Sequence, residues 1–98
     1  MYNNRHCIEK DLIQITTLIK RFVSYLDNEN IEAMSFAITL EKEIENFDND
    51  IARRFHAVIT NAKKFDGHET FIYMREKCQP LFDELTANIV VDIKEHNN

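Results

Sequence analysis

Residues 40–58, LEKEIENFDNDIARRFHAV, decide the fold of this 98-residue chain. Apolar side chains recur along this stretch at spacings of three or four, which places them on one face of a helix: Leu40, Ile44, Phe47, Ile51, Phe55 and Val58. Between them lies Asp48–Asp50, and Asp and Asn favour caps and turns over helix interiors. Either one long helix runs through the stretch, or two helices meet at Asp48–Asp50.

The same kind of interruption occurs at two other places in the chain. In each, a bulky apolar residue is followed by Asp and then by Asn or Gly: Leu26-Asp27-Asn28, Phe47-Asp48-Asn49 and Phe65-Asp66-Gly67. Asn and Gly tolerate the left-handed conformation that ends many helices. Asn30, Asp50 and His68 stand near the next starts, and Asn and Asp are good N-caps. These stops predict four helices, near residues 6–26, 30–47, 50–65 and 69–94.

Each predicted helix carries its own apolar stripe at spacings of three or four. The stripes are Ile8, Leu12, Ile15, Ile19, Phe22 and Leu26; then Ala33, Ala37, Leu40, Ile44 and Phe47; then Ile51, Phe55, Val58, Ala62 and Phe65; then Phe71, Met74, Cys78, Phe82, Leu85, Ile89 and Ile93. Short loops favour antiparallel neighbours, so we expect one all-α domain over residues 1–98, an up-down four-helix bundle. Pro80 lies opposite the last stripe, which keeps its phase there, so we expect a kink and not a new helix at Leu81.

An alternative fold has three helices. The apolar stripe stays in phase across Asp48–Asp50, as it would in one continuous helix over residues 30–65. Half of such a helix would lie uncovered in a monomer, so this alternative requires a dimer.

Composition excludes several classes of protein. The formal net charge of −5 argues against general nucleic-acid binding, which depends on neutralising phosphates. Two cysteines fit a reduced compartment, and the absence of a signal peptide or a long apolar run predicts a cytoplasmic protein without a membrane segment. With one glycine there is no phosphate-binding loop, and no nucleophile has a recognisable catalytic context, so we expect no enzyme activity.

Metal-binding motifs are absent from the sequence. The four histidines are His6, His56, His68 and His96, and none belongs to a Glu-x-x-His or His-x-x-x-His pair. Cys-x-x-Cys is absent too. His6 with Cys7 offers part of a terminal site, but a frayed terminus is the simpler interpretation. We therefore expect no metal and no cofactor.

The third predicted helix carries a basic face with a histidine. Arg53, His56, Lys63 and Lys64 share this face and form a candidate anion-binding site. In architecture alone the chain resembles histidine-phosphotransfer domains, which are four-helix bundles with an exposed histidine; the Lys and Gly of their local pattern are replaced here by Ile59 and Thr60. The competing interpretation is a solvated face whose arginines pair with acids of residues 41–50.

Apolar residues outside the core stripes indicate a protein partner. They are Ile31, Phe36 and Ile38 on the second helix and Ile72, Tyr73 and Val90 on the fourth. A cluster of such residues marks an interface, either with a second copy in a homodimer or with another protein. The leading hypothesis is a small bacterial or phage adaptor or regulator that binds a protein, like an immunity protein, antitoxin, secretion chaperone or phage inhibitor.

Overall fold

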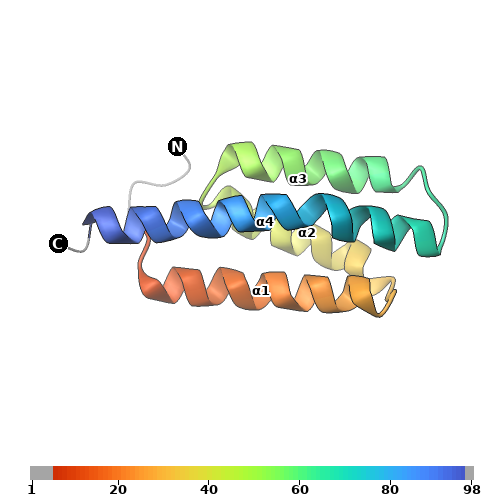
Figure 1. Cartoon of the computed structure of the whole chain (residues 1–98), viewed down its shortest axis with the longest axis horizontal. Helices are drawn as coiled ribbons and strands as arrows, with labels where there is room; N and C mark the ends of the chain where they lie inside the picture. Colours follow the sequence, from red (N-terminus) through yellow and green to blue (C-terminus); the bar gives the residue numbers. More distant parts are fainter. Residues whose placement is uncertain (1–5, 97–98) are drawn as a thin grey trace.

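Four α-helices form the whole of the regular structure in the described part of the chain. The computed structural model describes residues 6–96, and its helices are α1 (Glu9–Asp27), α2 (Glu32–Glu45), α3 (Asn49–Ala62) and α4 (His68–His96) (Figure 1). The predicted all-α bundle is therefore confirmed, with each helix boundary within about three residues of its expected place, the usual uncertainty of helix ends.

The helices run alternately up and down and pack in a closed ring. The backbone of α1 lies close to those of α2 and α4, and the backbone of α3 lies close to the same two, while the diagonal pairs approach each other only through side chains in the core. The described part measures 48 × 22 × 19 Å, and α4 extends past α2 and α3 at the end where α1 begins (Figure 1). As a consequence of the ring, the α2–α3 face and the α1–α4 face lie on opposite sides of the bundle.

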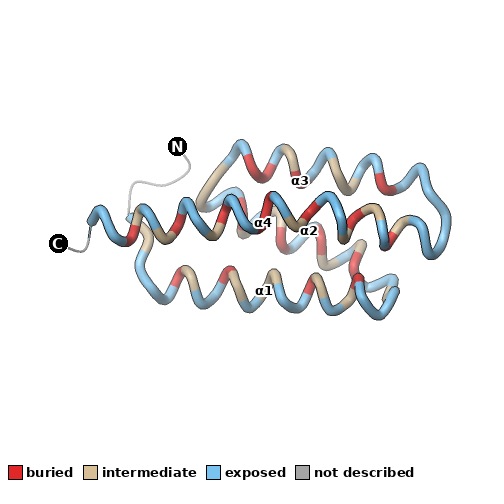
Figure 2. Tube along the Cα trace, in the orientation of Figure 1, coloured by how far each residue is buried: buried red, intermediate tan, exposed pale blue. Residues whose placement is uncertain are grey.

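The core lies along the central axis and uses the predicted stripes. Figure 2 shows the buried positions repeating along each helix on the side that faces the other three. At its centre, Phe22 of α1 meets Phe55 of α3 and Phe82 of α4, with ring centroids 5.5 and 6.0 Å from that of Phe22. Two stripe residues depart from the expectation: Ile8 and Phe65 are exposed, because each lies just outside its helix.

The break between α2 and α3 rules out the long central helix. α2 ends at Glu45, and Asp48 takes an extended backbone conformation with φ −159°. The Asp48 side chain then accepts a hydrogen bond from the backbone N–H of Ile51, so Asp48 and not Asp50 is the N-cap of α3. The three-helix alternative over residues 30–65 is wrong, because this turn folds α3 back against α2.

The turn between α1 and α2 uses a residue that the sequence does not suggest. Glu29, and not Asn28, takes the left-handed conformation, with φ +50°. Its N–H donates to the carbonyl of Leu26, and the N–H of Asn30 donates to that of Tyr25, which is the Schellman pattern of helix ends. Gly67 has φ +54° before α4, as its place after Phe65-Asp66 predicts.

Pro80 lies inside α4, on its exposed side. The helix continues through it without a break from His68 to His96, so no new helix starts at Leu81. The helix tolerates a proline here because the Pro80 ring faces outward, and the core stripe before and after Pro80 stays buried.

Candidate functional site

The outer surface between α2 and α3 forms a groove, and the half near the start of α2 is apolar. Ile31, the residue before α2, and Ile38 of α2 lie about two helical turns apart along one line and are 81% and 63% exposed. Ile38 lines a hollow together with Met34 of α2 and Ile59 of α3. Lys63 also lines this hollow, so the apolar surface has a cation beside it.

The other half of the groove is charged, and one pair of side chains marks the boundary. Nδ1 of His56 on α3 lies 2.9 Å from Oε1 of Glu41 on α2. Both residues line the apolar hollow and also the neighbouring hollow, which Glu45 and Arg53 line as well. The groove is thus continuous, with acids on its α2 side and bases on its α3 side.

Two of the four predicted anion-binding residues have carboxylate partners. Nη2 of Arg53 lies 3.3 Å from Oδ1 of Asp50, and His56 is paired with Glu41. Lys63 and Lys64 are exposed at the end of α3, and only Lys63 lines the groove. Within the described residues, the expected pairing with acids of residues 41–50 is therefore present at Arg53 and His56 but not at Lys63 and Lys64.

Arg54, next to this basic face, points the other way. Its guanidinium lies 2.6 Å from Oε2 of Glu84 on α4 and 3.0 Å from Oδ2 of Asp50. The hydrogen bond with Glu84 is the main cause that raises the pKa of Arg54. This pair links α3 to α4 and leaves Arg54 outside the groove.

Two of the three predicted partner-binding residues of α4 lie on the opposite side of the bundle from Ile38. Ile72 and Val90 line two separate hollows at the two ends of the α1–α4 face. Ile13, 65% exposed on α1, shares the second hollow with Val90. The six candidates therefore do not form one surface.

Two of these candidates are engaged inside the chain. Phe36 meets Tyr25 edge to face, with ring centroids 5.6 Å apart, and the guanidinium of Arg21 lies 5.6 Å from the Phe36 ring centroid. Tyr73 packs on Phe65 with centroids 4.9 Å apart. Phe36 and Tyr73 are partly buried against the core, so they offer less area to a partner than Ile31 and Ile38 do.

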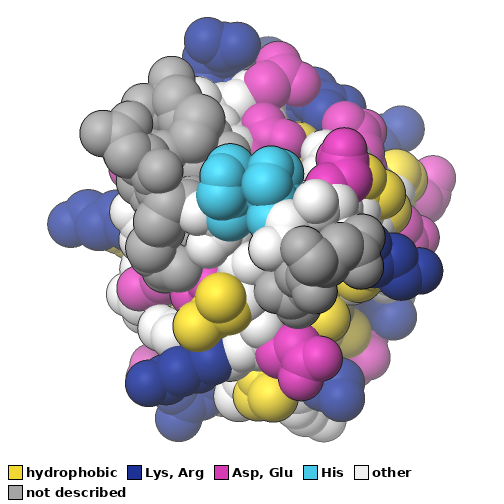
Figure 3. All heavy atoms as spheres, turned by 90° about the vertical axis from the view of Figure 1, so that its left-hand side faces the viewer, with side chains coloured by type: hydrophobic (Ala, Val, Ile, Leu, Met, Phe, Trp, Pro, Cys, Tyr) yellow, Lys and Arg dark blue, Asp and Glu magenta, His cyan; other side chains and the backbone are white. Residues whose placement is uncertain are grey.

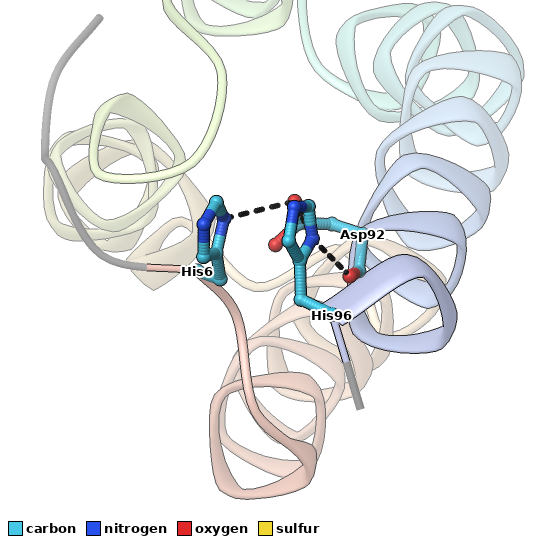
Figure 4. A group of neighbouring side chains, drawn as sticks. All are labelled: His6, Asp92 and His96. Atoms are coloured by element: carbon cyan, nitrogen blue, oxygen red, sulfur yellow. Dashed lines mark hydrogen bonds and ion pairs between the residues drawn. The ribbon is translucent and has the colours of Figure 1, made fainter. Parts of the chain in front are cut away.

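A second group of polar side chains lies at the end of the bundle where α1 begins and α4 ends. Figure 3 looks at this end and shows histidine side chains gathered on it. His6 stacks on His96 of α4, with ring centroids 3.5 Å apart and planes 9° from parallel (Figure 4). Oδ1 of Asp92 lies 3.7 Å from Nδ1 of His6 and 3.5 Å from Nδ1 of His96.

The other carboxylate oxygen of Asp92 is held by the segment before α1. Oδ2 accepts a hydrogen bond of 2.6 Å from the backbone N–H of Cys7, and this bond is the main cause that lowers the pKa of Asp92. Within residues 6–96 this is the only place where three side chains able to bind one metal ion converge. Short sequence motifs do not reveal this cluster, because His6 is far from Asp92 and His96 in the chain.

No protein-family model, curated protein or solved structure matches this chain. None of the helices within residues 6–96 combines the length and the apolar character that a membrane span needs. The fold and its surfaces define a class: a four-helix bundle with an exposed groove, half apolar and half charged, between its two shortest helices.

Proposed function

We propose that this protein is a small protein-binding regulator that holds an amphipathic helix of another protein in the α2–α3 groove. The observation that carries the proposal is the high exposure of Ile38, which lines the hollow with Met34 and Ile59. Ile31, about two turns away along the same line, is exposed as well. Large apolar side chains clustered on a surface mark interaction sites. A groove between two helices suits the apolar stripe of a third helix.

The charges of the groove indicate which side chains a bound helix should carry. Lys63 lines the apolar half and Glu45 lines the charged half, and neither forms an ion pair with another residue of the described part of the chain. A suitable helix carries apolar residues at spacings of three and four, a carboxylate facing Lys63 and a base facing Glu45. From Met34 to Glu45 the groove is about 17 Å long at 1.5 Å per residue, which takes about three turns of such a helix.

A second copy of this chain is the strongest competing occupant. A two-fold axis parallel to the helices would place α2 of one copy against α3 of the other, so acids would face bases. We favour a different partner, because the unpaired charges, Lys63 and Glu45, lie at opposite ends of the groove. With that axis, Lys63 of one copy would lie at the same height along the bundle as Lys63 of the second copy, and Glu45 at the same height as Glu45. Lys63 would therefore not meet Glu45 of the second copy.

Phosphotransfer and anion binding have weaker support from the same geometry. The carboxylate of Glu41 lies 2.9 Å from the imidazole of His56, and Glu45 lines the adjoining hollow. Two acids beside the ring oppose the approach of a phosphoryl group or a nucleic-acid backbone. The setting that we propose for the regulator is the cytoplasm of a bacterium or of a phage-infected cell, in keeping with its size and acidic charge.

Site-specific photocrosslinking tests the proposal. A photoreactive residue at position 38 is expected to capture a protein segment with the stated helix pattern, whereas the same residue at position 13, equally exposed on the opposite face, is expected not to. A synthetic peptide of that segment should become helical on binding. Ile38→Glu should weaken its binding by about thirtyfold or more, the scale of an interface hot spot, while Ile13→Glu leaves it unchanged.

Three outcomes would overturn the proposal. Crosslinks from position 38 that join only copies of this chain would assign the groove to a homodimer. A captured peptide that binds equally well to Ile38→Glu would place the contact elsewhere. A captured segment without an apolar stripe, or a nucleic acid, would replace helix binding with another activity.

Lys63→Glu should mainly slow association of the peptide and reduce the salt dependence of the association rate.

A further inference from the structure

We propose that His6, Asp92 and His96 form a binding site for a divalent transition metal, and that Zn²⁺ is the ion that fits these donors best. Two imidazole nitrogens and one carboxylate oxygen are a common protein ligand set for zinc, with water in the fourth position. The ligand atoms already lie within 4.8 Å of one another. Zinc bonds of about 2.0–2.2 Å would draw them roughly 1 Å closer. The exposed rings have room for that adjustment, since the side chains of His6 and His96 are 58% and 40% exposed.

The carboxylate of Asp92 is oriented before any ion arrives. Its Oδ2 accepts the backbone N–H of Cys7, which leaves Oδ1 directed toward the two imidazoles (Figure 4). Hydrogen bonds of this kind hold metal-ligating carboxylates in place in known sites. The bond also ties the segment before α1 to α4, so His6 stays close to the other two ligands.

His96 is positioned by its own helix. Asp92 and His96 are four residues apart, a spacing that puts both side chains on one face of α4. Nδ1 of His96 lies 3.0 Å from the backbone carbonyl oxygen of Asp92, and this contact helps to hold the ring beside the Asp92 carboxylate. The negative end of the α4 dipole, in its last turn, also favours a cation.

The stack keeps the His6 ring beside the His96 ring, with centroids 3.5 Å apart. To direct one nitrogen each at a shared ion, the two rings would tilt apart, and their exposure leaves room for this. The ion would act as a clamp between the segment before α1 and the end of α4, where α4 extends past α2 and α3 (Figure 1).

The clamp lies at the end of the α1–α4 pair, away from the α2–α3 groove, so it does not depend on the proposed function. Competition titration tests it: the full chain, stripped of metal by a chelator, is titrated with Zn²⁺ against a chromophoric chelator. We expect one ion per chain. His96→Gln and His6→Gln should each weaken binding at least about tenfold, the lower limit known for ligand-supporting residues. The matched controls His56→Gln and His68→Gln, two exposed histidines that each face a glutamate, should bind as the wild type does.

Hydrogen exchange gives a second measurement that does not rely on affinity. Zn²⁺ should slow exchange of the Cys7 and Ile8 amides in the wild type and have no effect on them in His96→Gln. The proposal is overturned if the wild type binds no Zn²⁺, or if His56→Gln weakens binding as much as His96→Gln does. It is also overturned if Cys7→Ser, which keeps the backbone donor to Asp92, abolishes binding while His96→Gln retains it, because the thiol would then hold the ion.

Discussion

The carboxylate of Asp48 accepts a hydrogen bond of 3.0 Å from the backbone N–H of Ile51. Its other oxygen accepts a hydrogen bond of 3.2 Å from Nδ2 of Asn88 on α4. One side chain therefore caps α3 and also fastens the α2–α3 turn to the neighbouring helix. This arrangement turns a continuous apolar stripe into two antiparallel helices, and with them into the groove that lies between them.

Replacing Asp48 with Ala should lower the free energy of unfolding by about 1–2 kcal/mol, the usual cost of losing an N-cap. Urea denaturation monitored by circular dichroism measures the change. Asp50→Ala is the matched control: it removes only exposed ion pairs with Arg53 and Arg54, each worth about 1 kcal/mol or less. Equal losses in the two variants would contradict the role of Asp48 as the cap.

Replacing Glu29 with Gly should raise stability by about 0.5–1 kcal/mol. Glu29 has φ +50°, a conformation that costs free energy for any residue with a Cβ and little for glycine. The substitution also removes a contact between Glu29 and the Nδ1 atom of His68, but both side chains are exposed and such pairs contribute little. His68→Gln measures that contact alone. A net loss of stability in Glu29→Gly would show that the contact outweighs the backbone strain.

Replacing Phe55 with Ala should destabilise the bundle by about 3–5 kcal/mol, because the side chain is fully buried. Its ring meets those of Phe22 and Phe82, with centroids 5.5 and 5.9 Å away, so three helices lose contacts at once. Phe65→Ala, at an exposed position after α3, should cost about 1 kcal/mol or less. Thermal and urea unfolding of both variants measure the difference, and similar losses would contradict the placement of the core.

The thiol of Cys78 should resist alkylation in the folded protein. Burial raises its pKa to about 12, so almost none is thiolate at pH 8, and the side chain is enclosed in the core. Its rate of reaction with iodoacetamide should therefore follow the rate of opening and rise steeply with urea. Cys7, half-buried at the end of the bundle and not joined to Cys78 by a disulfide, serves as the internal comparison. Rapid labelling of Cys78 without denaturant would contradict this account.

The number of helices and their buried faces follow from local patterns in the chain. A helix repeats every 3.6 residues, so the spacing of apolar residues marks its inner face before any tertiary contact is known. Asp-Asn and Asp-Gly stops divide those stripes, because these residues compete with helix hydrogen bonds. Up-down order with four helices then brings the start of α1 and the end of α4 to the same end of the bundle.

The sequence alone does not decide which residue caps a helix or takes the left-handed conformation at each turn. Asp48 and Asp50 are both good caps by residue type, and only the extended backbone at Asp48 directs its carboxylate to the N–H of Ile51. Asn tolerates the left-handed conformation better than Glu does. Glu29 nevertheless takes this conformation, because the helical hydrogen bonds of α1 continue through Asp27 and make Asn28 the C-cap. A preference of about 1 kcal/mol between neighbouring positions is easily overridden by packing of the flanking helices.

Which side chains share a surface is decided mainly by how the helices are arranged in three dimensions. Periodicity shows that Ile38 and Val90 lie off the core stripes, but the ring order of the helices puts them on opposite faces. His6 and Asp92 are separated by almost the whole chain, and only the packing of the first segment beside α4 brings them to 3.7 Å. Helix formation is decided by hydrogen bonds between residues four apart, whereas the convergence of side chains from different elements is decided by how those elements pack.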